Sequence, residues 1–349
     1  RKVTRAFDEN HAPADREDLR NTLCLTIDPP DAKDFDDAIS LRRIDEAPVA
    51  YELGIHIADV AHFVGRETAL DEESRQRGNS AYLPQCVIPM LPEILSNGVC
   101  SLQEGANRYC KSVFIRYDAK GKVVSQRHCR SVIRSKKRFT YREAQAVIDD
   151  DLKAARKHAK TDPKYPPAVT MALRHMDELA KIIRRRRLKA GMIVLNLPEV
   201  ELIYNDSGRV IDAVPEDSAF THTLIEMFMV EANEAVARLF DGLDVAMIRR
   251  IHPDPDAVDL GELRQFARVA GHNVPARPSR SELQQLLEAV RDKPQERAVH
   301  LAVLKTLSKA EYAPLRVGHF ALASEHYSHF TSPIRRYSDL VVQRALDAY

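Results

Sequence analysis

The sequence predicts an α+β fold in which helices wrap a mixed β-sheet core. Residues 23–28 and 51–57 alternate apolar and polar side chains, which is the pattern of a strand with one buried face. Residues 109–117 and 122–134 show strand character on either side of a short turn, and they predict a hairpin. Residues 168–189 repeat apolar side chains at the spacing of an amphipathic helix. Strands and helices therefore both contribute to the predicted core.

Capping and turn residues define the remaining elements. Thr140 and Glu143 have the spacing of a capping box, which predicts that a short helix begins there. Gly78 and Gly191 are expected to end the helices before them. The prolines in 77–102 predict an extended, packed loop rather than a helix. The other expected elements are helices at 67–77, 220–240, 256–271, 279–291 and 295–309, a strand at 245–251, a hairpin of 199–204 with 209–214, and a linker at 161–167.

Composition describes an ordinary globular protein. Of 349 residues, 44% are hydrophobic and 30% are charged, and the formal net charge is +1. No apolar run is long enough to span a bilayer, and the first residues lack the apolar stretch of a signal peptide. The five cysteines contain no C-x-x-C pair and are expected to be reduced, so we expect a cytoplasmic protein that does not bind membranes. The basic residues in 134–138 could contact phosphates or form a solvated strand end.

Five aspartates lie within ten residues, directly after the first predicted strand: Asp28, Asp31, Asp34, Asp36 and Asp37. Pro29 and Pro30 end that strand, because neither can donate a ladder hydrogen bond. Two carboxylates ~4 Å apart repel by about 4 kcal/mol at an effective dielectric near 20, so a converging cluster needs protons, basic partners or metal ions. Oxygen ligands without nearby Cys or His point to Mg²⁺ or Mn²⁺.

A pair of such ions, about 3.5–4 Å apart, is a known device for phosphodiester cleavage. The alternative is a solvated acidic loop, which is how most aspartate-rich runs behave. Phe35, Ala38 and Ile39 alternate with the acids and weigh against that alternative. The twelve-residue calcium loop is excluded, because its glycine and its terminal glutamate are missing. His56 and His62 could also bind metal, but we favour hydrogen-bonded structural roles for both.

A second chemical element lies near the end of the chain. Ser332 is a favourable N-cap and Pro333 suits the first helical position, so a helix is expected to begin there. Arg335 and Arg336 would then project from its first turn, where the helix dipole disfavours cations. Free backbone N–H groups together with two arginines predict a phosphate site. The alternative is a pair of surface ion pairs with Asp339, three and four residues further on.

Four stretches of the sequence match the signatures of one enzyme family. They are TIDPPDAKDFDDAIS, LGIHIADVAHFV, YLPQCVIPMLPEILSNGVCSL and HFTSPIRRYSDLVVQRAL, in this order from about residue 20 to the end. They resemble the RNB catalytic domain of the ribonuclease II and ribonuclease R family, and ribonuclease R most. The resemblance implies a single α+β domain with an RNA channel. We therefore expect residues 1–20 to be a lead-in and 21–349 to be the catalytic domain, without the OB-type RNA-binding domains that flank it in the family.

The resemblance implies an activity as well as a fold. The family contains processive 3′→5′ exoribonucleases, which hydrolyse single-stranded RNA to nucleoside 5′-monophosphates with Mg²⁺ during RNA degradation and turnover. Asp28, Asp34 and Asp37 match acids that would hold metal. Asp36, at the same metal site, would matter most for cleavage. One metal would activate water and the other would steady the leaving 3′ oxygen. Asp31 matches no catalytic acid and is expected to be a turn residue.

The resemblance also implies which residues contact RNA. Arg335 matches the arginine that meets the scissile phosphate, and Arg336 would support it. Tyr82 matches the aromatic residue that stacks on the 3′-terminal base. Tyr141 and Glu226 match residues that sense the terminal ribose, and contacts to its 2′-OH would favour RNA. Without the family, each of the three would have an ordinary structural explanation. Tyr82 would pack in a loop, Tyr141 would begin a helix, and Glu226 would belong to a buried polar network. The full implied set is Tyr82, Tyr141, Glu226, Ser332, Arg335 and Arg336.

One position departs from the family pattern. Leu195 stands where the family often has a Phe opposite the stacking tyrosine, so we expect a weaker grip on the last nucleotide. We expect a monomer that binds the 3′ end of single-stranded RNA without an obligate protein partner. A non-catalytic RNA-binding module on the same fold is disfavoured, because all four matching acids are present. A metal-dependent phosphodiesterase for DNA or short oligonucleotides is disfavoured by the ribose-sensing candidates.

Overall fold

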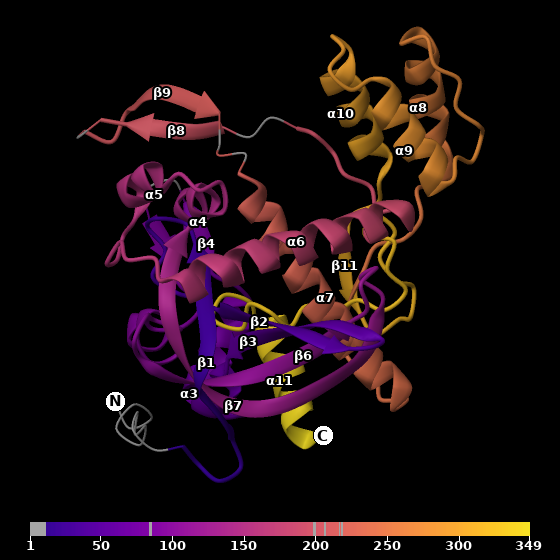
Figure 1. Cartoon of the computed structure of the whole chain (residues 1–349). Coiled ribbons are helices and arrows are strands. Elements are labelled where there is room, and N and C mark those ends of the chain that lie inside the picture. Colours follow the sequence, from indigo (N-terminus) through magenta and orange to yellow (C-terminus); the bar gives the residue numbers. More distant parts are fainter. Residues whose placement is uncertain (1–11, 84–85, 198–199, 206, 216, 218) are drawn as a thin grey trace. The chain divides into compact units, whose positions relative to one another are not determined.

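The computed structural model describes residues 12–83, 86–197, 200–205, 207–215, 217 and 219–349. The chain divides into two compact units, which are described separately. Unit 1 consists of Arg1–Ile183, Asp217–Leu239 and His329–Tyr349, and unit 2 consists of Arg184–Glu216 and Phe240–Ser328. Both units contain strands and helices (Figure 1), so the predicted α+β class is confirmed. In the described ranges, no helix is both long enough and apolar enough to cross a membrane.

The core of unit 1 is a closed five-stranded β-barrel. The strands around it, in order, are β1 (Glu17–Asp28), β2 (Asp37–Glu46), β3 (Val49–Ala58), β6 (Asn107–Tyr117) and β7 (Val123–Thr140). Neighbouring strands pair antiparallel, except that β1 and β7 close the barrel in parallel. The mixed sheet is therefore confirmed, whereas its closure into a barrel was not predicted.

The alternation read from the sequence corresponds to burial inside this barrel. Apolar side chains from its strands are fully or almost fully buried, among them Leu25, Ile27, Ile39, Leu53, Ile55 and Ile57. His56 is buried between two hydroxyl groups, with Nε2 2.9 Å from Ser40 Oγ and Nδ1 2.7 Å from Ser112 Oγ. Burial lowers the pKa of His56 to about 3. The structural role favoured for His56 is confirmed.

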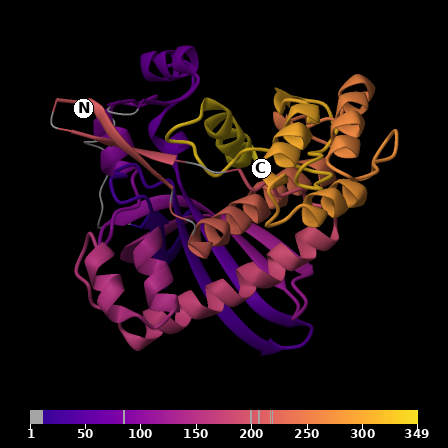
Figure 2. The ribbon, with the colours of Figure 1, turned by 90° about the horizontal axis from the view of Figure 1, so that it is seen from above.

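Among the described residues of unit 1, α-helices surround the barrel or continue from it. They are α2 (Val60–Phe63), α3 (Ala69–Arg77), α4 (Tyr141–Ile148), α5 (Leu152–His158), α11 (Tyr337–Ala348), and the parts of α6 (Pro167–Lys189) and α7 (Phe220–Gly242) that fall in this unit. Helix α4 begins directly after β7 and packs beside α5 (Figure 2). The predicted capping box is present, because Thr140 and Glu143 each accept the other's backbone N–H.

The segment 77–102 differs from its prediction. It contains a small hairpin of β4 (Ala81–Leu83) with β5 (Cys86–Ile88), and a helical turn of π type at Ile94–Val99. The extended loop expected there was therefore wrong in part. The carbonyl of Pro92 accepts the N–H groups of Leu95 and Ser96, so the proline starts the turn instead of preventing it. Pro84 lies outside the described residues.

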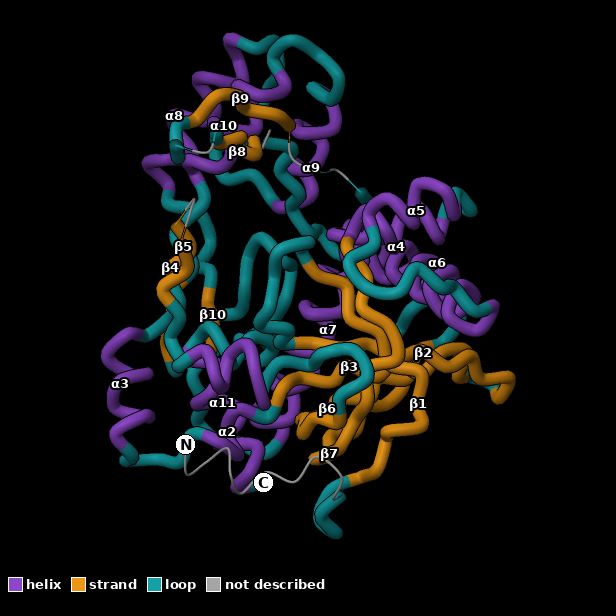
Figure 3. Tube along the Cα trace, turned by 90° about the vertical axis from the view of Figure 1, so that its left-hand side faces the viewer, coloured by secondary structure: helices purple, strands orange, loops and turns teal. Residues whose placement is uncertain are grey.

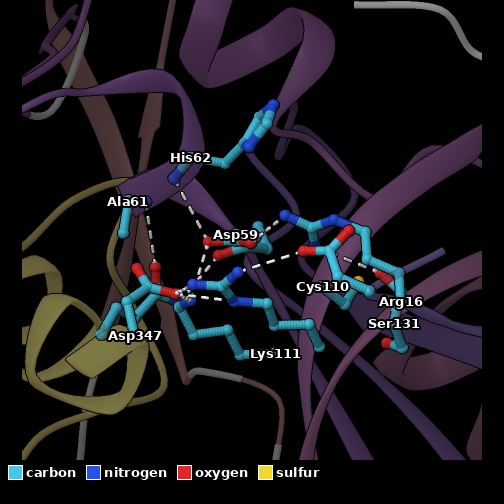
Figure 4. A network of polar contacts seen from close by, with 12 residues as sticks. Arg16, Asp59, Ala61, His62, Cys110, Lys111, Ser131 and Asp347 are labelled. Carbon is cyan, nitrogen blue, oxygen red and sulfur yellow. Dashed lines mark hydrogen bonds and ion pairs between the residues drawn. The ribbon is translucent and has the colours of Figure 1, made fainter. Parts of the chain in front are cut away.

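A buried ion network fixes helix α11 to the barrel (Figure 4). Asp59 Oδ2 lies 2.7 Å from Arg16 Nη2, and its Oδ1 lies 3.2 Å from Lys111 Nζ. Lys111 also pairs with Asp347 near the end of α11, as does Arg130 at 2.7 Å. Burial alone would raise the pKa of Asp59, but the charges of Lys111 and Arg16 outweigh it and lower the pKa. The network holds the far end of the helix that follows the Arg335 segment.

The described residues of unit 2 form a helical cluster, a small hairpin and a second two-stranded sheet. Three helices lie beside one another (Figure 3): α8 (Ala257–Val269), α9 (Arg280–Ala289) and α10 (Glu296–Thr306). Their shared core includes Leu263, Leu283, Val299 and Val303. The hairpin is β8 (Val200–Tyr204) with β9 (Val210–Pro215), as predicted. The second sheet pairs β10 (Arg249–Ile251) with β11 (Glu311–Ala313), which respectively precede and follow the helical cluster in the chain. The strand predicted at 245–251 is thus shorter than expected, and its partner was missed.

Candidate active site

The two chemical elements of the sequence meet in unit 1. We call residues 28–37 the acid loop and residues 331–336 the arginine turn. The backbone N–H of Ile334 donates to Asp36 Oδ1 at 2.9 Å. Arg335 Nε lies 3.9 Å from the other carboxylate oxygen of Asp36. A side chain near the start of the chain and a turn near its end therefore form one site.

Barrel pairing brings the acids to one end of the barrel. Asp28 is the last residue of β1 and Asp37 is the first residue of β2, and these two strands are antiparallel neighbours. Asp28 and Asp36 are only 9% and 5% exposed. Asp34 is partly exposed, as is Asp37. In the part of the chain that the structure describes, the buried Oδ2 of Asp28 has no hydrogen-bond partner.

The pKa values of three acids in the loop are raised, chiefly by burial. Burial and the charges of Asp37, Asp36 and Asp34 raise the pKa of Asp28 well above its ordinary value. Burial also raises the pKa of Asp36, against the opposing effects of the Ile334 N–H and the Arg335 charge. The pKa of Asp37 rises to about 6, again chiefly through burial, with Arg335 opposing it. The basic groups nearby therefore do not offset the effect of burial.

These acids have the properties that a hard divalent cation requires. They offer only carboxylate oxygens, and one of these is buried without a partner. No three His, Cys, Asp or Glu side chains among the described residues are already arranged around one point as metal ligands. The donor set fits Mg²⁺ or Mn²⁺, and Asp28, Asp34, Asp36 and Asp37 are the residues that could hold it.

The acid loop is held in place by neighbouring strands and loops. Arg138 on β7 donates to the carbonyls of Pro29 and Pro30 at 3.1 and 3.0 Å, and its guanidinium lies 4.9 Å from the centre of the Phe35 ring. Ser101 Oγ donates to the Lys33 carbonyl at 2.7 Å and accepts the Phe35 N–H at 3.1 Å. Arg138 thus stabilises the loop, which neither reading of the basic stretch 134–138 had foreseen.

The arginine turn is not the first turn of a helix. Helix α11 begins at Tyr337, and Arg336 occupies the N-cap position with extended backbone. The prediction of a helix start at Ser332 is therefore wrong. Asp339 provides the reason, because its Oδ1 accepts the Ser332 N–H at 2.8 Å and pairs with Arg336 Nη2 at 2.7 Å. The two carboxylates, Asp339 and Asp36, occupy N–H groups that the prediction had assigned to phosphate.

The two arginines of this turn consequently differ. Arg336 forms the ion pair with Asp339 that the alternative reading described. Arg335 donates to Ser332 Oγ at 3.2 Å, and its side chain remains 45% exposed beside Asp36. Ser332 itself is buried. Arg335 therefore combines contact with the acid loop and access to solvent.

The aromatic candidates lie near the acids. The hydroxyl of Tyr82 donates to Asp34 Oδ2 at 3.0 Å, while the side chain stays half exposed beside a cavity of about 430 Å³. Tyr141 follows Thr140, which is paired with Asp28 across β1 and β7. Burial raises the pKa of Tyr141, and so do the charges of Asp37 and Asp28.

The other two candidates have different surroundings. Glu226 is exposed on α7 rather than buried in a polar network. Leu195 lies in unit 2, where it is partly buried against the α8–α10 cluster. Its suggested place opposite the stacking tyrosine stays a prediction.

Two residues of this region were missed at the sequence level, Arg138 as a support and His222. The ring of His222 stacks on Tyr141 with centroids 3.8 Å apart and planes 20° from parallel. Arg138 was visible only as one base among several. His222 precedes Glu226 by four residues, which is the spacing of one helix face, and this was the one available signal.

Comparison with known proteins identifies the family. The RNB domain matches residues 16–349. This chain belongs to the RNB domain family. The RNB domain described here is 41% identical over 339 residues to Ribonuclease R of Thermotoga maritima, covering 96% of this chain and 46% of that protein. It is 38% identical over 333 residues to Ribonuclease R of Aquifex aeolicus, covering 95% of this chain and 46% of that protein. The resemblance read from the four signatures is confirmed.

Solved structures agree with this family. The chain is similar to Mycoplasma genitalium RNase R in complex with ribose-methylated single-stranded RNA, with a TM-score of 0.91 and 32% identity, over 99% of this chain and 53% of that one. The chain thus spans about half the length of the curated relatives and of this solved relative. The RNB fold is established over almost the whole chain.

Proposed function

We propose that residues 21–349 form the catalytic domain of a processive 3′→5′ exoribonuclease that hydrolyses single-stranded RNA to nucleoside 5′-monophosphates. Its role would be RNA degradation and turnover. The family supports this proposal, because the curated relatives are ribonucleases R and one solved relative binds single-stranded RNA. The free cysteines, three of them buried, are compatible with a cytoplasmic enzyme. We further propose a monomer that acts on RNA 3′ ends without an obligate protein partner.

One observation carries the proposal more than any other. One carboxylate oxygen of Asp36 accepts the Ile334 N–H, and the other lies 3.9 Å from Arg335 Nε. A buried carboxylate, three further acids and an exposed arginine are the groups that a phosphodiester needs at the scissile bond. A solvated acidic loop would not bury Asp28 and Asp36 or raise their pKa values.

The proposed roles follow from the contacts. Asp28, Asp34, Asp36 and Asp37 would hold Mg²⁺, or Mn²⁺ in its place. When bound, such ions supply a more acidic water and offset charge on phosphate oxygens. Asp36 is fixed by its backbone hydrogen bond, so its carboxylate keeps one orientation at the phosphate. Arg335 offers its exposed guanidinium to the same phosphate.

Other residues would bind the RNA around the scissile bond. Tyr82 presents a half-exposed ring for the 3′-terminal base. Tyr141 and Glu226 would sense the terminal ribose and favour RNA over DNA. Ser332 and Arg336 would act through the shape of the arginine turn, because Ser332 accepts from Arg335 and Arg336 pairs with Asp339.

The test uses a 5′-labelled RNA with an unpaired 3′ end. With Mg²⁺, the purified chain should shorten it stepwise from that end, and the released nucleotides should be 5′-monophosphates by chromatography. EDTA should stop the reaction. Asp36→Asn should also stop it while RNA binding, measured by fluorescence anisotropy, is retained. The matched control is Asp31→Asn, whose side chain is 94% exposed and should not matter.

Each alternative has a distinct outcome. RNA binding without any shortening by the wild type would identify a binding module on the RNB fold. Equal degradation of DNA would identify a general phosphodiesterase. Full activity in Asp36→Asn would refute the role of Asp36, and loss of activity in Asp31→Asn would show that the loop as a whole was disturbed.

A further inference from the structure

The ring of Tyr141 rests on a second ring that has no place in the proposed mechanism. His222 lies flat against it, with centroids 3.8 Å apart and an angle of 20° between the planes. Tyr141 is the first residue of α4, and His222 is the third residue of α7. Two helices that are distant in the chain therefore place their first turns against each other through stacked rings.

Polar contacts fix the two helix starts to each other. The buried Thr221 donates its hydroxyl to the Tyr141 carbonyl at 2.9 Å, and its N–H donates to Gln145 Oε1 at 3.2 Å. Asp217 bridges the same elements, because its Oδ2 lies 3.4 Å from Arg142 Nε and 3.5 Å from His222 Nε2. The backbone beside His222 is thus held by Thr221, and the Asp217 carboxylate lies close to the His222 ring.

This stack lies beside the acid loop. The charges of Asp37 and Asp28 act on Tyr141, as their effect on its pKa shows. Glu226 follows His222 by four residues and so projects from the same face of α7. His222 and Glu226 therefore share one face of α7, and the Tyr141 ring that stacks on His222 is close enough to the acids to experience their charge.

We propose that His222 is a positioning residue, which holds the Tyr141 ring so that the active site distinguishes ribose from 2′-deoxyribose at the 3′ end. This inference rests on the proposed exoribonuclease function. His222 would act through Tyr141 and Glu226 and not on the scissile bond. Asp217 would in turn hold the imidazole, since it pairs with both His222 and Arg142.

His222 would act on the orientation of the Tyr141 ring. A tyrosine at the first position of a helix lacks a preceding turn to pack against, so its ring needs an external support to keep one rotamer. A small misplacement of a positioning group can cost up to ~100-fold in rate, and selectivity for one hydroxyl group is more sensitive than overall binding. Loss of the support should therefore reduce ribose discrimination more than it reduces general turnover.

The test compares two 5′-labelled RNAs that differ only in the 3′-terminal sugar, ribose or 2′-deoxyribose. The measured quantity is the ratio of kcat/KM for the two substrates. His222→Ala should lower this ratio about tenfold, and Tyr141→Ala should lower it at least as much. His222→Phe keeps a flat ring and should restore most of the ratio. The double variant of both residues should be no worse than Tyr141→Ala.

Further variants separate positioning from stability. His222→Gln keeps a polar side chain of similar length without a ring, and it should behave like His222→Ala; it also serves if the alanine variant does not fold. Asp217→Asn should show an intermediate loss of the ratio. The melting temperature of each variant is measured without RNA, and restoration by phenylalanine must occur in a variant that melts like the others.

The outcomes distinguish this inference from the function on which it rests. A wild type that shortens neither RNA defeats the proposed function. A wild-type ratio that survives Tyr141→Ala removes the role of Tyr141, and the inference with it. A ratio that falls in Tyr141→Ala but is unchanged in His222→Ala and His222→Gln overturns the inference alone. A ratio that falls equally in His222→Phe also overturns it, because the ring would then not be what matters.

Discussion

Replacing Asp37 by asparagine should stabilise the protein in the absence of divalent cations, even though it should abolish activity. Burial raises the pKa of Asp37 from 3.8 to about 6. At pH 8 the carboxylate is ionised in both the folded and the unfolded state. The raised folded-state pKa makes this ionisation less favourable in the folded protein than in the unfolded chain, by about 3 kcal/mol. A chain of 349 residues unfolds with an entropy of roughly 0.7 kcal/mol/K. Asp37→Asn should therefore raise the melting temperature by about 4 °C.

The pH dependence has a defined sign. Because the folded-state pKa of Asp37 is raised, the stability that protonation contributes is complete below about pH 3.8 and is lost as the pH rises through about 6. The difference in melting temperature between Asp37→Asn and the wild type should then be small at pH 4 and complete at pH 8. Differential scanning calorimetry in EDTA measures both values. The control is Asp31→Asn, whose exposed side chain should change stability by less than ~0.5 kcal/mol.

Divalent cations should reverse the order of the melting temperatures of Asp37→Asn and the wild type. Mg²⁺ that binds the folded acid loop raises the melting temperature of the wild type by mass action, whereas Asp37→Asn has lost one ligand and should respond less. Saturating Mg²⁺ should therefore close or invert the gap seen in EDTA. If Asp37→Asn melted below the wild type in EDTA at pH 8, the acid loop would be stabilised by its charges, and the argument for a cation site would fail.

Three further predictions concern neighbouring contacts. Tyr82→Phe loses the hydrogen bond to Asp34 and should raise the Mg²⁺ concentration for half-maximal thermal stabilisation about tenfold. An unchanged Mg²⁺ concentration would show that this hydrogen bond does not contribute to cation binding. Arg138→Ala removes both hydrogen bonds to the acid loop and the guanidinium beside Phe35, so it should lower both kcat and the melting temperature; values equal to those of the wild type would contradict this. Gly54→Ala would place a Cβ 2.4 Å from Ser40 Oγ and should cost about 1–3 kcal/mol in urea denaturation; a neutral result would show that the barrel relaxes.

Helix starts and ends could mostly be predicted from the sequence, because they depend on residues that are close together in the chain. The capping box at Thr140 and the glycine end of α3 at Gly78 follow from spacing alone, and both are present. The helix start at Ser332 was predicted from the same kind of signal, and that prediction was wrong. Ser332 and Pro333 carry the right local signal, but the Asp339 carboxylate binds the Ser332 N–H and delays the helix to Tyr337. A side-chain contact seven residues further along the chain overrode the capping preference of Ser332.

The site shows the same division between local and distant information. The acid loop could be recognised from its residues, because five aspartates after a strand are unusual. Its partner could not, since the hydrogen bond between Asp36 and Ile334 joins residues 298 positions apart. The meeting of the two segments was supplied by family resemblance and not by any spacing. The stacking of His222 on Tyr141 had no such help and was missed.

The barrel register explains how the distant residues come together. Asp28 at the end of β1 pairs with Thr140 at the end of β7, so Tyr141 emerges beside the acids. Two irregularities set this register: three extra residues of β1 lie between the Leu19–Ile133 and Cys24–Ser135 pairs, and one extra residue of β7 follows, because the next residue of β1 pairs with Lys137. Without the extra residue in β7, Asp28 would lie opposite Phe139, and every side chain beyond would change faces. One inserted residue in a parallel pair thus aligns the acids with the tyrosine that we propose reads the ribose.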